Sequence, residues 1–85
     1  MKILCWNIAG IRASLKRGDF DFLLNSDYDV VCIQETKATH EQGEKALSKS
    51  LKEKYLWRAW NSTKGTTQRK GFSGTSIWSR ERPLK

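Results

Sequence analysis

Short apolar runs that end abruptly in polar residues are the main pattern of this sequence. The first, residues 2–8, begins with Lys2, is apolar or aromatic at residues 3–6 and at Ile8, and carries Asn7 near its end; the turn-favouring Gly10 follows. The second, residues 30–33, shows no polar alternation and leads directly into the polar residues 34–37. An unbroken run of this kind is typical of a strand covered on both faces. The pattern therefore predicts two buried strands that each end beside polar side chains.

A helical stretch lies between these two runs. Residues 11–16 predict a short helix that ends near Gly18, and Asp19 is positioned to cap a second helical piece. The apolar face of that piece follows the i, i+3, i+4 spacing of a helix and consists of Phe20, Leu23 and Leu24. A polar turn at residues 25–29 then leads into the second strand.

A longer helix is predicted after the second strand. Thr39 and Gln42 have the spacing of a capping box, and the helix should continue to about Lys54. Its apolar face consists of Leu47, Leu51 and Tyr55. The lysines of this stretch are more simply explained as a solvated helix face than as a binding site.

Two further strands are predicted near the end of the chain. Residues 55–60 and 74–79 are separated by the polar, basic segment 61–73, and this short spacing indicates that they pair antiparallel. Pro83 marks the end of the last strand. The order of elements predicts an α/β fold, in which a mixed β-sheet is flanked by helices within a single domain over residues 1–85.

Charge adds a preference for polyanionic partners. The chain has 16 basic and 9 acidic residues, which gives a net charge of +7. Such a balance favours nucleic acid or an anionic surface, although a lysine-rich soluble surface explains it equally well. No apolar run approaches the length of a membrane span and no secretory signal is visible, so we expect an intracellular protein, in the cytoplasm or in the nucleus of a eukaryote.

The two cysteines are expected to lie apart. Cys5 precedes Asn7 by two residues and Cys32 precedes Glu35 by three. If Asn7 and Glu35 face one site, side-chain alternation places the two thiols on opposite faces of the sheet. We therefore expect two reduced, buried thiols and no disulfide.

Asn7 and Glu35 are the candidate catalytic and metal-binding residues, because each stands near the carboxyl end of a predicted strand. If the two strands are neighbours, one amide and one carboxylate converge. Oxygen ligands of this kind suit Mg²⁺, which keeps several waters and often binds one or two carboxylates together with substrate phosphate. Spacing alone favours a simpler explanation, a turn-forming Asn and a solvated strand end.

The basic segment also carries candidate binding residues. Lys70, Gly71 and Ser73 can bring charge and backbone amides to phosphate groups, and Phe72 can stack on a base or enter a minor groove. An ordinary hairpin loop with a core aromatic residue at its base is an equal alternative. The sequence shows no zinc-ligand spacing, no phosphate-binding Gly-Lys-Ser/Thr loop and no nucleophilic Cys or Ser arrangement, and its one histidine, His40, is expected on the surface.

Taken together, four motifs resemble the first third of an exonuclease III-type AP endonuclease, a member of the endonuclease/exonuclease/phosphatase superfamily. They occur in the family's order and nearly span the chain: Trp6-Asn7-Ile8-Ala9-Gly10-Ile11-Arg12-Ala13, Asp29-Val30-Val31-Cys32-Ile33-Gln34-Glu35-Thr36-Lys37, Lys70-Gly71-Phe72-Ser73-Gly74-Thr75 and Ser79-Arg80. Asn-x-x-Gly alone would be a weak signal. Its combination with Gln-Glu-Thr-Lys and Gly-aromatic-Ser-Gly is specific.

The resemblance implies a role for each matching residue. Glu35 corresponds to the metal-binding glutamate, and Asn7 to the active-site asparagine that orders the metal and its surroundings. Arg12 and Lys37 fall near the DNA-binding and catalytic face. The segment from Gly71 to Gly74 resembles the loop that meets the DNA backbone, with Phe72 where relatives often carry Tyr. The DNA-binding residues expected here are Lys70, Gly71, Phe72 and Ser73. Ala9 stands where many relatives carry Asp or Asn, which implies one oxygen fewer beside the metal.

The family's fold is a two-sheet α/β sandwich about three times as long, and its remaining catalytic residues lie beyond the matched part. The resemblance therefore implies an N-terminal portion of a nuclease that hydrolyses DNA 5′ to abasic sites. It implies Mg²⁺, with Mn²⁺ as the alternative ion, duplex DNA with abasic sites as the partner, and a complementary C-terminal polypeptide for activity. The alternatives are a non-catalytic basic domain that binds nucleic acid or a partner protein, and a phosphatase fragment, which the basic segment disfavours.

Overall fold

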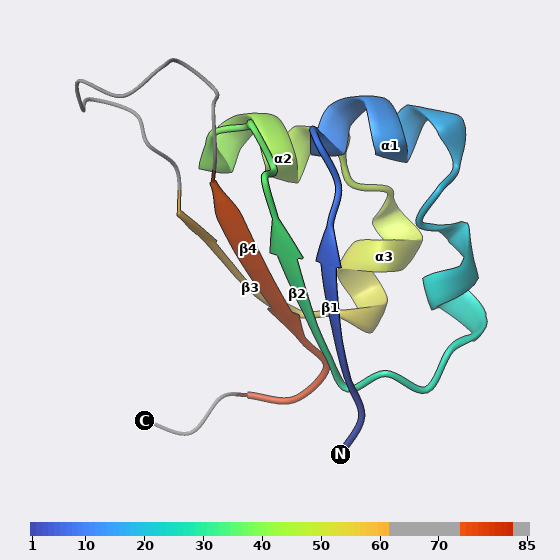
Figure 1. Ribbon diagram of the computed structural model, residues 1–85. Coiled ribbons are helices and arrows are strands. Elements are labelled where there is room, and N and C mark those ends of the chain that lie inside the picture. Colours follow the sequence, from blue (N-terminus) through green and yellow to red (C-terminus); the bar gives the residue numbers. More distant parts are fainter. Residues whose placement is uncertain (62–73, 83–85) are drawn as a thin grey trace.

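The structure is a computed structural model that describes residues 1–61 and 74–82 (Figure 1). In chain order its elements are β1 (Ile3–Asn7), α1 (Ile11–Arg17), the 3₁₀ helix η1 (Asp21–Asn25), β2 (Val30–Gln34), α2 (His40–Ala46), α3 (Lys49–Lys54), β3 (Trp57–Asn61) and β4 (Thr75–Ser79). The predicted α/β class and the positions of the strands are confirmed.

The strands form one mixed sheet in the order β1-β2-β4-β3. β1 and β2 are parallel, whereas β4 is antiparallel to both β2 and β3. The predicted antiparallel pairing of β3 with β4 is therefore confirmed. β4 lies between β2 and β3, so the last strand of the chain occupies an inner position of the sheet.

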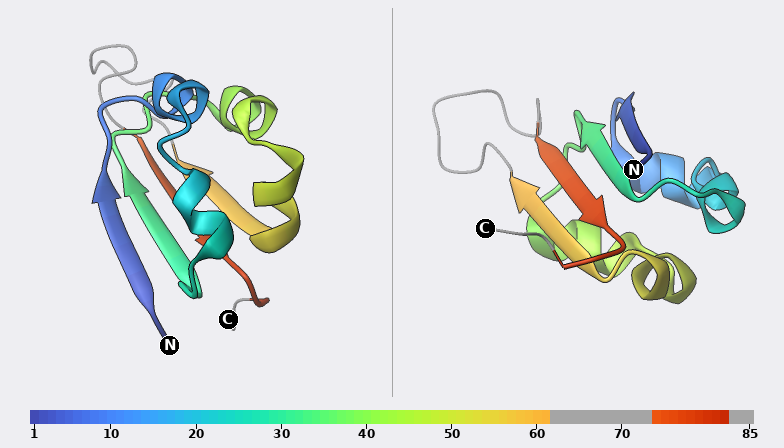
Figure 2. Two further views of the ribbon diagram at one scale, coloured as in Figure 1. Left: turned by 90° about the vertical axis from the view of Figure 1, so that its right-hand side faces the viewer. Right: turned by 90° about the horizontal axis from the view of Figure 1, so that it is seen from below.

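All helices lie along one face of this sheet (Figures 1 and 2). The sheet contributes Val31, Ile33 and Trp78 to the interface, and each of these side chains is at most 1% exposed. The helical side and its connections contribute the remaining large core side chains, which are Ile8, Ile11, Phe20, Leu23, Leu47, Leu51 and Tyr55. The core is thus a single layer between the helices and one sheet face.

The opposite sheet face, here called the open face, is not covered by the described helices. It is formed by alternate residues of the four strands: Ile3, Cys5, Asn7, Val30, Cys32, Gln34, Trp57, Ala59, Asn61, Thr75, Ile77 and Ser79. Val30 and Cys32 are only half-buried and Ile77 is 51% exposed. In the part of the chain that the structure describes, the helices cover only the sheet face opposite to the open face. The prediction that residues 30–33 form a strand covered on both faces is therefore wrong for this part of the chain.

The predicted helix from Thr39 to Lys54 is divided into α2 and α3. Thr39 and Gln42 form the expected capping box at the start of α2. The chain becomes extended at Leu47, and the Ser48 hydroxyl then accepts a hydrogen bond from the Leu51 N–H to start α3. Serine offers the backbone this alternative partner, which is why it favours helix starts over helix interiors.

The region after α1 differs from the prediction in a similar way. Gly18 ends α1 in the left-handed conformation, as expected of a helix C-terminal glycine. Asp19 caps no helix; its carboxylate instead binds the Arg17 guanidinium at 2.7 Å, and η1 begins at Asp21 without a side-chain cap. Leu24, predicted on the apolar face, is 39% exposed, because a 3₁₀ helix has three residues per turn and turns this residue outward.

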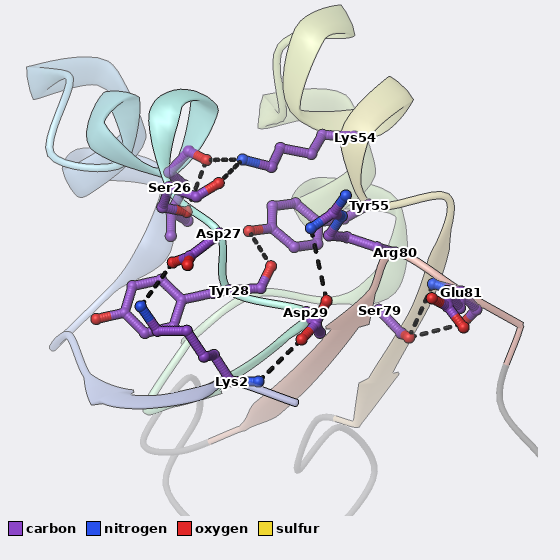
Figure 3. Close-up of polar contacts among 11 residues, drawn as sticks. Lys2, Ser26, Asp27, Tyr28, Asp29, Lys54, Tyr55, Ser79, Arg80 and Glu81 are labelled. Atoms are coloured by element: carbon purple, nitrogen blue, oxygen red, sulfur yellow. Dashed lines mark hydrogen bonds and ion pairs between the residues drawn. The ribbon is translucent and has the colours of Figure 1, made fainter.

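Polar contacts centred on Asp29 tie the strands together at the end of the sheet where β2 begins (Figure 3). The Asp29 carboxylate accepts a hydrogen bond from the Lys2 backbone N–H at 2.8 Å and lies 3.5 Å from the Arg80 guanidinium. The Tyr55 hydroxyl donates to the Tyr28 carbonyl at 3.1 Å. These contacts join the start of β1, the start of β2 and the residue after β4, so Asp29 has a structural role.

Among residues 1–61 and 74–82, every helix falls short of the length and apolar character that a membrane-spanning segment needs.

Candidate active site

Asn7 and Glu35 lie together at one edge of the sheet. β1 and β2 are parallel neighbours, so their carboxyl ends meet at the same edge. Asn7 is the last residue of β1, and Glu35 follows the last residue of β2. The Asn7 side-chain amide donates a hydrogen bond to Glu35 Oε2 at 2.8 Å. The predicted convergence of these two side chains is confirmed.

Glu35 reaches Asn7 because the backbone leaves the strand conformation. Its φ is +57°, in the left-handed region that non-glycine residues rarely adopt. Gln34 is the residue in register with Asn7, so alternation would turn Glu35 toward the helices. The left-handed turn returns the carboxylate to the Asn7 side of the edge.

This turn also explains why the expectation for the cysteines is wrong. If Glu35 continued the strand on the same face as Asn7, side-chain alternation would place Cys32 on the face opposite to Cys5. In the structure Cys5 and Cys32 are register partners and both belong to the open face. Both cysteines are free, as expected, although Cys5 is exposed and Cys32 is half-buried.

A polar row extends from the Asn7–Glu35 pair across the open face. Asn7 is in register with Gln34, Gln34 with Thr75, and Thr75 with Asn61, and all four side chains are exposed. The remaining open-face positions are mostly apolar or thiol side chains. The candidate site therefore lies where a largely apolar surface ends in uncharged hydrogen-bonding groups.

Arg12 and Lys37, for which a DNA-facing position was predicted, lie beside the pair. The Arg12 guanidinium donates a hydrogen bond to the Lys37 backbone carbonyl at 3.2 Å. Arg12 is exposed on α1 and Lys37 is half-buried, with a left-handed φ of +51°. The structure thus brings four of the predicted site residues to the carboxyl edge of the sheet.

The other predicted DNA-binding residues, Lys70, Gly71, Phe72 and Ser73, lie outside the described residues. Gly74, which follows them in sequence, is described and buried, and its carbonyl accepts a hydrogen bond from the Thr36 N–H at 3.1 Å. Gly74 was predicted as the last residue of the loop that meets the DNA backbone, whereas Thr36 stood in a matching motif without a predicted role.

The donor set suits part of a hard-cation site. Within residues 1–61 and 74–82 no cluster of three or more His, Cys, Asp or Glu side chains is placed to hold a metal. Glu35 supplies one carboxylate and Asn7 an amide, which fits an ion that keeps most of its waters and takes its other ligands from phosphate. The arrangement can hold a hydrated divalent cation at a phosphate group, but it offers few protein ligands.

The comparison with protein families agrees with this geometry. The model of the Endonuclease/Exonuclease/phosphatase family matches residues 4–85. The chain therefore belongs to this family.

Within the family, the chain is similar to DNA-repair nucleases. It is 35% identical to the exodeoxyribonuclease of Bacillus subtilis (strain 168), with 100% of this chain and 30% of that protein covered. It is 34% identical to the DNA repair nuclease APEX1 of Danio rerio, with 99% of this chain and 26% of that protein covered. The chain thus spans under a third of the length of these relatives.

Solved structures show the same similarity in three dimensions. The Xenopus laevis APE2 catalytic domain superposes with a TM-score of 0.63 at 32% identity, over 93% of this chain and 23% of that one. The AP endonuclease LMAP of Leishmania major shares the fold with a TM-score of 0.57 at 24% identity, over 91% of this chain and 23% of that one. The resemblance to the N-terminal portion of exonuclease III-type AP endonucleases is therefore confirmed.

Proposed function

We propose that this chain is the N-terminal portion of a DNA-repair nuclease that hydrolyses the phosphodiester 5′ to an abasic site. The observation that carries the proposal is the 2.8 Å hydrogen bond between Asn7 and Glu35 at the carboxyl edge of parallel strands. Relatives of this chain are named as an exodeoxyribonuclease and a DNA repair nuclease, which supports DNA as the substrate class. Such a substrate implies a location in the cytoplasm or, in a eukaryote, the nucleus.

Glu35 would hold the metal ion and Asn7 would orient the Glu35 carboxylate. Enzymes of this family generally depend on divalent metal ions, and Mg²⁺, or Mn²⁺ in its place, would supply charge stabilisation at the scissile phosphate. Oxygen ligands from a carboxylate and an amide match both ions. The Asn7 amide restricts the rotation of the Glu35 carboxylate, and its hydrogen bond favours one orientation of the oxygens.

The basic residues beside the pair would bind the DNA backbone. Arg12 and Lys37 lie next to Glu35, so phosphate bound by them would be close to the metal ligand. Lys70, Gly71, Phe72 and Ser73 are assigned to the same partner on the strength of their motif. Backbone contacts of this kind position a duplex without reading its sequence.

We further propose that this portion is inactive alone and requires a complementary C-terminal polypeptide. Its relatives are more than three times as long. The open face exposes Ile3, Trp57 and Ile77, which a second layer would cover. Because the Asn7–Glu35 pair lies at the end of this face, that second layer would also border the site.

The test is the nicking of a duplex with one abasic site in the presence of Mg²⁺. We expect no nicking by the chain alone, and nicking when the remainder of a related nuclease domain is added as a separate polypeptide. Glu35→Ala should abolish the reconstituted activity, whereas Glu53→Ala, at an exposed position of α3, should preserve it. Activity that survives Glu35→Ala would refute the role of Glu35, and nicking by the chain alone would refute its incompleteness.

A non-catalytic basic domain is the second candidate function. The net charge of +7 and the small number of metal ligands in the described residues favour it. It predicts salt-dependent binding of duplex DNA that is equal with and without an abasic site and is unchanged by Glu35→Ala. Reconstituted nicking would exclude this candidate.

A further inference from the structure

The turn that carries Glu35 concentrates backbone strain at the candidate site. Among residues 1–61 and 74–82, three non-glycine residues have a left-handed φ, and all three border this edge of the sheet: Ala9 at +35°, Glu35 at +57° and Lys37 at +51°. Each such residue is less stable than in an ordinary conformation by about 1 kcal/mol or more. Strain of this kind persists only where surrounding contacts hold it.

One set of contacts comes from the start of α1. The Glu35 carbonyl accepts a hydrogen bond from the Gly10 N–H at 2.8 Å, and the Thr36 carbonyl accepts one from the Ile11 N–H at 2.9 Å. The Arg12 guanidinium then binds the Lys37 carbonyl at 3.2 Å. Three successive carbonyls of the turn are thereby held from the α1 side.

The second set comes from Gly74, just before β4. Its carbonyl accepts the Thr36 N–H at 3.1 Å, on the other side of the same turn. A Cβ at Gly74 would lie 2.7 Å from Thr36 Oγ1 and 3.3 Å from the Asn61 carbonyl oxygen, and φ at Gly74 is +131°. Only glycine therefore allows this close approach without displacing Thr36.

We propose that Gly74 and Arg12 are positioning residues, which hold the left-handed turn from two sides and so direct the Glu35 carboxylate toward Asn7. Neither residue needs to touch the metal for this role. The inference rests on the proposed function only where it treats Glu35 as a metal ligand; the geometry of the Asn7–Glu35 pair can be measured without metal.

The first test uses the side-chain amide resonances of Asn7 in the isotope-labelled, metal-free chain. Glu35→Ala defines the resonance positions of an Asn7 amide that has lost its acceptor. We expect Gly74→Ala to move the Asn7 resonances most of the way toward those positions, while the indole resonance of the buried Trp78 reports that the core remains folded. Gly18→Ala is the matched control, because Gly18 also has a left-handed φ, +83°, but ends α1 far from this turn in sequence.

Two further variants keep the test decisive if Gly74→Ala does not fold. Arg12→Ala removes an exposed side chain and should shift the Asn7 resonances in the same direction by a smaller amount. Arg17→Ala, which removes the exposed arginine at the end of α1, should leave them unchanged. In addition, Thr36→Ala should partly restore the Asn7 resonances in a Gly74→Ala background, because it removes the oxygen that meets the new methyl group.

A Mn²⁺ titration separates this inference from the proposed function. If both hold, Gly74→Ala should weaken Mn²⁺ binding roughly ten- to hundredfold, as expected when a group that orients a metal ligand is lost. If the Asn7 resonances move as predicted and the parent chain binds no Mn²⁺ either alone or with the complementary polypeptide added, the metal assignment fails and the positioning role stands. Asn7 resonances that are unchanged in both Gly74→Ala and Arg12→Ala would overturn the positioning role.

Discussion

Cys5 and Cys32 are register partners midway along the neighbouring parallel strands β1 and β2, and both belong to the open face. Cys5 is exposed and Cys32 is half-buried. Burial raises the pKa of the Cys32 thiol, and the adjacent Cys5 raises it further. The two thiols are therefore neighbours with different environments.

We expect the two thiols to react with a small alkylating reagent in two phases. The thiolate is the reactive form, and a raised pKa lowers its fraction near neutral pH, so Cys32 should react several-fold more slowly than Cys5. The rate of the slow phase should still increase with pH in the range where the thiolate forms. Cys32→Ser should remove the slow phase, as followed by mass spectrometry; a single phase for both thiols in the parent chain would contradict the prediction.

The open face should bind an apolar probe. Ile77 lies within this face and is 51% exposed, so a fluorescent dye such as anilinonaphthalene sulfonate should bind there. Ile77→Lys should reduce the dye fluorescence by about half or more. Leu56→Lys is the matched control, since Leu56 is 63% exposed but lies between α3 and β3 and outside the open face. Equal losses in the two variants would show that the dye does not report this face.

Glu44 should contribute to acid stability. Its carboxylate accepts two hydrogen bonds from the Arg58 guanidinium, at 2.7 and 2.8 Å, and one from the Trp60 indole at 2.7 Å. The Arg58 contact, followed by that of Trp60, lowers the pKa of Glu44 to about 2. A lowered carboxyl pKa stabilises the fold above the unfolded value, and this stabilisation is lost as the pH falls from about 4.5 toward 2.

Urea unfolding at a series of pH values measures this effect. After allowance for partial solvent screening, Glu44→Gln should lower the free energy of unfolding at neutral pH by about 2 kcal/mol. The variant should also lose most of the pH dependence between about 4.5 and 2. Glu53→Gln, on exposed α3 surface, should retain it. If Glu44→Gln kept the same pH dependence of unfolding in the acid range, the contribution of Glu44 to acid stability would be refuted.

Gly43→Ala should destabilise the protein, although alanine is the better helix former. At a solvent-exposed position inside a helix, this substitution would raise the free energy of unfolding by about 1 kcal/mol. A Cβ at Gly43, however, would lie 2.4 Å from two ring carbons of Trp60. Overpacking of this kind lowers the free energy of unfolding by about 1–3 kcal/mol. Ser50→Ala, on the exposed surface of α3, should be neutral or slightly stabilising in the same thermal or urea measurement.

Local patterns predicted much of this fold. The apolar runs located the strands, and the capping box at Thr39 located the start of α2. The break at Ser48 was missed because the apolar positions Leu47 and Leu51 continue a helical spacing across it. Whether a serine caps a new helix or sits within a longer one depends on which arrangement lets both leucines pack against the sheet.

The sequence by itself determined the strands, the α/β class, the basic charge and the positions of Asn7 and Glu35 at strand ends, because these follow from composition and local periodicity. That β1 and β2 are parallel neighbours, which brings the two side chains together, came from the tertiary structure. Tertiary structure decided the place of β4 inside the sheet, the coverage of one sheet face and the pairing of Cys5 with Cys32. It also decided how Glu35 points, since a left-handed residue is held by contacts from α1 and Gly74 that lie far away in the chain. Side-chain alternation cannot predict a direction that long-range backbone contacts impose.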